Sequence, residues 1–239
     1  MVRGPLLLLP GLLCDATVWT HQATALGDIA DCQVIGYGNA DSINAMARTV
    51  LRQAPVKFAL AGHSMGGRVA LEVVRLAPQR ITHLGLFDTG YQARPAGETG
   101  DRERTERMAL LELARGEGMR VMGERWAKGM VHIDRLGEKA LMNAILDMID
   151  RKSADTFAAQ INALLGRPEA TGLLPHITQP TLLLCGREDS WSPLARHEQM
   201  AALIPHATLT IIENSGHMST MERPEAVAAA MREWLARMP

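Results

Sequence analysis

The segment Gly62-His63-Ser64-Met65-Gly66 places a serine between two glycines, directly after the apolar run Phe58–Ala61 and directly before a helical pattern that Pro78 ends. A serine at a sharp strand-to-helix turn projects its hydroxyl above the sheet, and glycines are needed where side chains would obstruct that turn. The helix N-terminus beneath it also favours developing negative charge. The spacing therefore predicts that Ser64 is a nucleophile, against the alternative of a chance turn rich in glycine and serine.

A serine hydroxyl is a poor nucleophile unless a base takes its proton and a carboxylate orients that base. Asp189 follows the apolar run Thr181–Cys185 within "GREDSWSP", and His217 follows Thr208–Ile212 within "SGHMSTMERPE". Both residues therefore leave the carboxyl ends of predicted strands, at the same sheet edge as Ser64. The order predicts that Asp189 orients the base and that His217 is the base.

Other side chains of the same types must be weighed against these two. Of the eight histidines, only His217 follows a predicted strand within a glycine-containing loop and precedes a helix. We interpret the other seven as structural, including His63 beside the serine. For the acid, Glu188 and Asp88 remain alternatives to Asp189, because Glu188 is its neighbour and Asp88 ends an earlier predicted strand.

The stretch "LLLLPGLLCD" resembles a secretion signal that runs into a lipid-acceptor cysteine, Cys14. Only one Arg precedes it, no small-residue cleavage site follows it, and Pro10-Gly11 interrupts its apolar run. We interpret Leu6–Leu9 as a buried strand beside the nucleophile strand. The loop after it then supplies one backbone N–H for an oxyanion, from Leu12, and the residue after the serine, Met65, supplies the other.

Strand-like and helix-like segments alternate at both ends of the chain. The predicted strands are Leu6–Leu9, Gln33–Gly36, Phe58–Ala61, His83–Phe87, Thr181–Gly186 and Ala207–Ile212, and a closing helix runs from about Pro224 to Arg237. Such alternation predicts an α/β fold with a mostly parallel sheet of about six strands, covered by helices on both faces. Residues 1–90 and 175–239 form this core. Residues 91–174 form an inserted, all-helical segment with helices at roughly 102–114, 119–130, 138–150 and 154–165.

Composition excludes several classes of function. The 239 residues carry 25 basic and 26 acidic side chains with no long block of one sign, which argues against a nucleic-acid partner or an anionic membrane surface. No apolar run approaches the roughly 20 residues that span a bilayer. Three widely spaced cysteines give neither a disulfide framework nor a metal site, so we expect reduced thiols, a cytoplasmic location and no metal or cofactor.

Four apolar side chains are candidates for the wall of a substrate pocket. They are Trp126 and Met130, on a helical stripe of the insertion, and Trp191 and Met218, beside the predicted acid and base. Packing of the insertion on the core explains each of them equally well. Because no Arg or Lys can be singled out as a partner for a carboxylate, the expected substrate is a small and mainly apolar molecule.

With these motifs in place, nearly the whole chain resembles the α/β-hydrolase superfamily, and within it capped serine esterases and lactonases. The resemblance rests on Gly11-Leu12, Gly62–Gly67, "GREDSWSP" and "SGHMSTMERPE". It implies that the usual N-terminal hairpin of two strands is missing and that the insertion is a cap, or lid. It further implies a Ser–Asp–His triad and an oxyanion hole at the positions already named.

The resemblance implies a serine hydrolase that cleaves an ester, an enol-lactone or a thioester through an acyl-enzyme. Hydrolases with an aspartate nucleophile are disfavoured because Ser64 holds that position. Carbon–carbon bond hydrolases commonly carry Asn where this chain has His63, so this alternative is weaker. A third possibility, from another class, is a small-molecule sensor with an intact triad and slow turnover. The sequence leaves the substrate and the oligomeric state open.

Overall fold

A six-stranded parallel sheet forms the centre of the molecule. The computed structural model describes residues 4–237, and its strands run in the order β2-β1-β3-β4-β5-β6. Their bounds are β1 Gly4–Leu9, β2 Ala30–Val34, β3 Phe58–His63, β4 Ile81–Phe87, β5 Thr181–Gly186 and β6 Ala207–Ile212. Every neighbouring pair is parallel. The prediction of an α/β-hydrolase fold with about six strands is confirmed.

The strands differ in burial according to their place in the sheet. β3 and β5 are buried at every residue, as expected where helices cover both faces of a parallel sheet. β2, an edge strand, alternates between buried and more exposed residues. The predicted strand Gln33–Gly36 begins too late, because Ala30, Asp31 and Cys32 pair with β1 without forming an apolar run. Beyond the last paired residue, Val34, the Ile35 N–H still donates to the Leu8 carbonyl.

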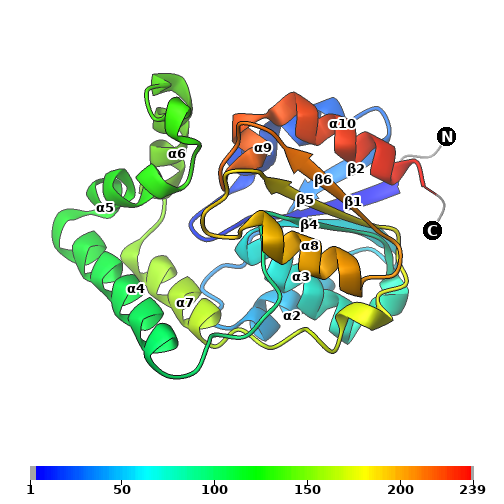
Figure 1. Cartoon of the computed structure of the whole chain (residues 1–239), viewed down its shortest axis with the longest axis horizontal. Helices are drawn as coiled ribbons and strands as arrows, with labels where there is room; N and C mark the ends of the chain where they lie inside the picture. The colour runs from blue at the N-terminus through cyan, green and yellow to red at the C-terminus, as the bar shows by residue number, and fades with distance from the viewer. Residues whose placement is uncertain (1–3, 238–239) are drawn as a thin grey trace.

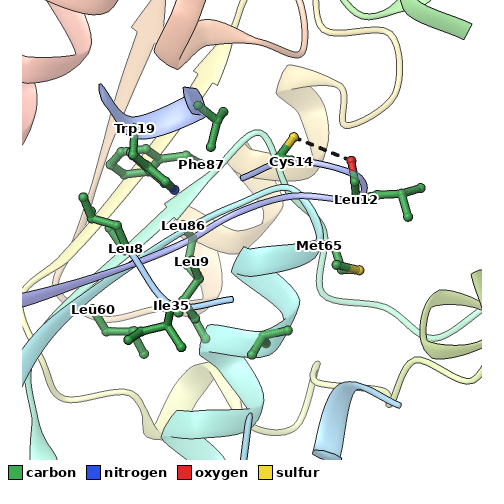
Figure 2. Packing of buried hydrophobic residues seen from close by; sticks show 14 of the residues in the cluster. Leu8, Leu9, Leu12, Cys14, Trp19, Ile35, Leu60, Met65, Leu86 and Phe87 are labelled. Carbon is green, nitrogen blue, oxygen red and sulfur yellow. Dashed lines mark hydrogen bonds between the residues drawn. The ribbon is translucent and has the colours of Figure 1, made fainter. Parts of the chain in front are cut away.

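Helices cover both faces of the sheet (Figure 1). On one face lie α2 Ile43–Gln53, α3 Met65–Leu76 and α8 Leu194–Leu203, and on the other lie α1 Thr20–Ala25, α9 Ser219–Glu222 and α10 Pro224–Leu235. Figure 2 shows how residues of β1, β3 and β4, among them Leu8, Leu60 and Leu86, pack together in the core. This packing fixes the strand ends from which the site is built.

The chain between β4 and β5, here called the helical insertion, holds α4 Glu98–Glu117, α5 Met119–Trp126, α6 Lys139–Asp150 and α7 Ala154–Leu165. These helices lie together beside the carboxyl ends of the strands, at the left of Figure 1. α5 ends at Trp126 and a 3-10 turn, Ala127–Gly129, follows it, so the predicted helix 119–130 is too long. A Cβ atom on Gly129 would lie 3.0 Å from Trp191 Nε1, so contact with the core accompanies this change of helix type.

Candidate active site

Ser64 occupies the strained turn between β3 and α3. Its backbone has φ 54° and ψ −116°, a conformation that residues with a Cβ atom rarely adopt. The flanking glycines allow this turn because there is no room for a side chain at either position. A Cβ atom on Gly62 would lie 2.2 Å from the Gly66 carbonyl oxygen, and one on Gly66 would lie 2.2 Å from the Leu9 carbonyl oxygen. The local sequence thus holds the Ser64 hydroxyl at the carboxyl edge of the sheet.

The fold brings Ser64, Asp189 and His217 together in one hydrogen-bonded chain. The Ser64 Oγ lies 2.8 Å from His217 Nε2, and His217 Nδ1 lies 2.8 Å from Asp189 Oδ2. The other carboxylate oxygen, Asp189 Oδ1, accepts hydrogen bonds from the N–H groups of Trp191 and Ser192 at 2.8 and 2.9 Å. Asp189 and His217 are both nearly inaccessible to solvent. This network fixes the tautomer: Nδ1–H donates to the carboxylate, which leaves Nε2 to accept the serine proton.

The charges of this chain follow from its contacts. Burial opposes ionisation of Asp189, but His217 and the two N–H donors outweigh it, so the pKa of Asp189 is lowered. Burial likewise opposes protonation of His217, but the negative charge of Asp189 outweighs it and raises the pKa of His217 above 6.5. A base of this kind holds a proton firmly enough to stabilise an imidazolium formed during a reaction.

Neither alternative acid contacts the His217 ring within hydrogen-bonding distance. Glu188 accepts the Ser215 N–H at 3.0 Å. Asp88 is fully buried at the end of β4, where it accepts hydrogen bonds from the Gly186 N–H and from the Ser219 hydroxyl. Burial and the negative charge of Asp189 raise the pKa of Asp88 to about 8. Asp88 therefore links the end of β5 to the start of α9 rather than orienting the histidine ring.

His63 supports the loop that carries His217. Its Nε2–H donates to the His217 carbonyl at 2.8 Å. Burial, with a further contribution from the charge of His217, lowers the pKa of His63 to about 3, so its ring is neutral. A second contact to the His217 backbone comes from the helical insertion, because the Met130 carbonyl accepts the His217 N–H at 2.8 Å. The His217 backbone is thus held by hydrogen bonds from two sides.

The loop after β1 passes directly beside the serine. A Cβ atom on Gly11 would lie 3.2 Å from the Ser64 Cβ, so the two segments are in contact. Neither the Leu12 nor the Met65 N–H donates to another group within residues 4–237. Figure 2 shows both residues at this end of the core, with the Cys14 thiol donating to the Leu12 carbonyl. Two backbone donors are thus available near the hydroxyl.

Side chains of the insertion hold the same loop from the other side. The Leu13 N–H donates to Gln160 Oε1 of α7 at 2.8 Å, and both groups are buried. Leu13 itself has φ 59°, an uncommon conformation for a residue with a side chain. Sequence analysis does not single out Gln160, since nothing in its neighbourhood along the chain indicates a partner 147 positions away.

A cavity of about 460 Å³ opens at the Ser64 hydroxyl, between the sheet edge and the insertion. Leu12, Met65, Trp126, Met130 and Trp191 line it, and the rings of Trp126 and Trp191 stack with their centroids 5.1 Å apart. Met218 is fully buried and is not among the lining residues.

Charged side chains line much of this cavity, which is therefore not mainly apolar. They are Arg68, Glu103, Glu106, Arg107, Arg167 and Arg196. The sequence does not identify this group, because its members come from four separate segments that only the folded chain brings together.

Three further features concern the described chain as a whole. Residues 4–237 contain no cluster of three or more His, Cys, Asp or Glu side chains with the geometry of a metal site. Within the same range, no helix combines the length and the apolar character that crossing a bilayer would demand. The three cysteines are unpaired.

The sequence also matches a known protein family. Residues 6–230 match the model of the alpha/beta hydrolase family, and the chain belongs to that family.

Two known proteins match most of this chain in sequence. The chain is 28% identical over 215 residues to the pimeloyl-[acyl-carrier protein] methyl ester esterase of Photobacterium profundum, covering 84% of this chain and 81% of that protein. It is 24% identical over 249 residues to the biotin biosynthesis bifunctional protein BioHC of Cellvibrio japonicus, covering 98% of this chain and 48% of that protein. The chain thus spans about half the length of this second relative.

A solved structure is similar over almost the whole chain. It is that of a thermophilic esterase from Thermogutta terrifontis with malate bound, at a TM-score of 0.85 and 31% identity. The similarity covers 98% of this chain and 90% of that chain. Two of these three relatives are esterases by name.

Proposed function

We propose that this protein is a serine hydrolase that cleaves a carboxylic ester-type bond of a small molecule through an acyl-enzyme on Ser64. The observation that carries the proposal is the hydrogen-bonded chain from Asp189 through His217 to the Ser64 hydroxyl, at the mouth of the cavity. The relatives that act on esters support the class of bond. In this reaction the three residues form a catalytic triad.

The steps follow from the positions of the donors and acceptors. The Ser64 Oγ attacks the ester carbonyl carbon while its proton passes to His217 Nε2. The N–H groups of Leu12 and Met65 stabilise the oxyanion of the tetrahedral intermediate. The intermediate collapses as His217 gives the proton to the leaving alcohol, which leaves the acyl group on Ser64. A water molecule, deprotonated by His217, then attacks the acyl carbonyl, and His217 returns this proton to the Ser64 Oγ as the acid is released.

The helical insertion acts in this proposal as a cap over the cavity. Trp126 and Met130 contribute to the wall, and Trp126 stacks on Trp191 of the core loop beside Asp189. Substrate therefore reaches Ser64 between the insertion and the sheet edge. The unpaired cysteines favour a reducing compartment, so the proposed location is the cytoplasm.

Hydrolysis of p-nitrophenyl esters of increasing acyl length tests the proposal. We expect turnover with an optimum at one acyl length, and a loss of about six orders of magnitude in kcat for Ser64→Ala. Ser190→Ala, which changes an exposed serine next to Asp189, is the matched control and keeps wild-type turnover. Equal rates for wild type and Ser64→Ala would reject the acyl-enzyme. Ligand binding without Ser64-dependent turnover of any ester would instead indicate a sensor.

A further inference from the structure

Four arginines line the cavity that holds the Ser64 hydroxyl, and they fall into two pairs. Arg107 of α4 and Arg167, which follows α7, form the first pair, and Arg68 of α3 and Arg196 of α8 form the second. The two pairs differ in how their charge is balanced.

One carboxylate neutralises the first pair. Glu103 Oε1 and Oε2 lie 2.7 and 2.8 Å from two nitrogens of Arg167, and Glu103 Oε1 lies 2.9 Å from Arg107 Nη2. Although burial opposes its ionisation, these arginines lower the pKa of Glu103 to about 2. Two guanidinium groups thus share one carboxylate inside this cavity.

The second pair has no such partner. Arg68 Nη1 donates to the Gln92 carbonyl at 2.8 Å, and Arg196 Nη1 donates to the Trp191 carbonyl at 3.2 Å. No carboxylate within residues 4–237 forms an ion pair with either guanidinium. The remaining acid of the cavity wall, Glu106, is exposed.

Arg68 and Arg196 converge on one small volume. A Cβ atom on Gly90 would lie 2.7 Å from Arg68 Nη2 and 3.3 Å from Arg196 Nη1. Burial, with the positive charges of Arg167 and Arg196, lowers the pKa of Arg68 to about 9, so the guanidinium remains protonated at neutral pH but is poorly compensated. Two like charges held this close are stabilised by an anion between them.

The pair also lies near the reacting group. Arg68 lies in the first turn of α3, four residues after Ser64, which directly precedes the helix. Both line the same cavity. An anionic group bound at Arg68 would therefore lie a few bonds from an ester carbonyl placed at the Ser64 hydroxyl.

We propose that the substrate is an ester that carries a free carboxylate, and that Arg68 and Arg196 bind this carboxylate as Arg107 and Arg167 bind Glu103. The inference rests on the proposed ester hydrolysis and specifies its substrate class. Guanidinium groups suit this role because their planar N–H donors match the two oxygens of a carboxylate. The apolar wall of Trp126, Met130 and Trp191 then contacts the rest of the substrate.

Matched pairs of esters test the proposal. The monomethyl esters of the dicarboxylic acids from succinate to pimelate are compared with methyl esters of monocarboxylic acids of the same chain length, by following acid release at constant pH. Since a hydrogen bond to a charged group contributes about 1.5–3 kcal/mol, wild type should prefer the carboxylated ester about 10- to 100-fold in kcat/KM at its best chain length. The preference should fall as salt is added.

Variants assign the preference to particular residues. In Arg68→Gln the ratio of the two kcat/KM values should collapse toward one, mainly through KM, whereas Arg68→Lys should retain part of it. Arg196→Gln provides an independent variant, and thermal unfolding checks that each protein folds. Arg52→Gln, which removes an exposed arginine of α2 outside the cavity, should keep the wild-type ratio.

Binding separates a failure of this inference from a failure of the proposed function. The Ser64→Ala variant is titrated with adipate by calorimetry, with and without Arg68→Gln. Ser64-dependent hydrolysis of neutral esters without any preference for a carboxylate would overturn the substrate class and leave the hydrolase standing. Adipate binding that needs Arg68, in a protein that hydrolyses no ester, would support the site and reject the hydrolase. Equal binding of inorganic phosphate would overturn the assignment to a carboxylate, and no binding would overturn the site.

Discussion

At the scale of single residues, the protonation of His217 decides the reaction proposed for Ser64. Only the neutral ring accepts the serine proton, and Asp189 raises the pKa of His217 above 6.5 despite burial. The asymmetry between the two carboxyl groups of the site is equally important. Asp189 is the ionised partner of the ring, whereas burial and Asp189 itself raise the pKa of Asp88 to about 8. Of these two carboxyl groups, only Asp189 therefore carries a full negative charge at neutral pH.

The pH dependence of turnover follows from this arrangement. Because the protonated form of His217 is inactive as a base, kcat/KM should be low in acid and should rise with pH through an apparent pKa above 6.5. Asp189→Asn removes the charge that raises this pKa, so its profile should move to lower pH while kcat falls by about four orders of magnitude. A profile that shifts upward in Asp189→Asn would contradict the role given to Asp189.

At the scale of elements, the turn from β3 into α3 is the most constrained part of the site. In Gly66→Ala the new methyl group would lie 2.2 Å from the Leu9 carbonyl oxygen, so β1 and α3 cannot keep their contact. We expect a loss of several kcal/mol in the free energy of unfolding, or failure to fold. The control is Gly116→Ala in α4, where nothing lies within 4 Å of the added methyl group; thermal unfolding of the two variants makes the comparison. Equal stability of both would show that the turn tolerates a side chain.

The same elements explain why the fold could be predicted from the sequence. β5 carries an apolar run between polar turns, and β6 alternates threonine with apolar residues; the predicted bounds of both strands agree with the structure. The glycines of the β3–α3 turn, likewise, are required by contacts that any sequence with this turn must make. The predicted bounds of β2 begin too late, because its first residues, Ala30-Asp31-Cys32, pair with β1 although they do not form an apolar run.

At the scale of the whole molecule, the contacts that the sequence alone does not reveal are those between the insertion and the core. Arg68 lies in a helix of the core, Arg167 comes after α7, and the two line one cavity only because the insertion folds over the sheet edge. Periodicity along the chain carries no information on such contacts. The same holds for Gln160, whose partner Leu13 belongs to the first loop of the core.

This long-range contact supports a prediction for catalysis. In Gln160→Leu the buried Leu13 N–H loses its acceptor, which costs about 1–3 kcal/mol and releases the loop that carries the Leu12 N–H. We expect kcat to fall about 5- to 100-fold with a smaller change in KM, since an oxyanion donor acts mainly in the transition state. Gln53→Leu on the exposed side of α2 is the control. An unchanged kcat in Gln160→Leu would mean that the loop keeps its conformation without this hydrogen bond to the insertion.

The hydrogen bond from the His217 N–H to the Met130 carbonyl limits how this family member can diversify. Exchange of the insertion for that of another hydrolase is an attractive route to a new substrate range, because the wall of the cavity would change while the sheet stays intact. Here such a graft would also remove an acceptor from the backbone of the base. A chimaera must therefore inherit a carbonyl at the Met130 position together with its new wall, and the two parts of this chain must evolve as one unit.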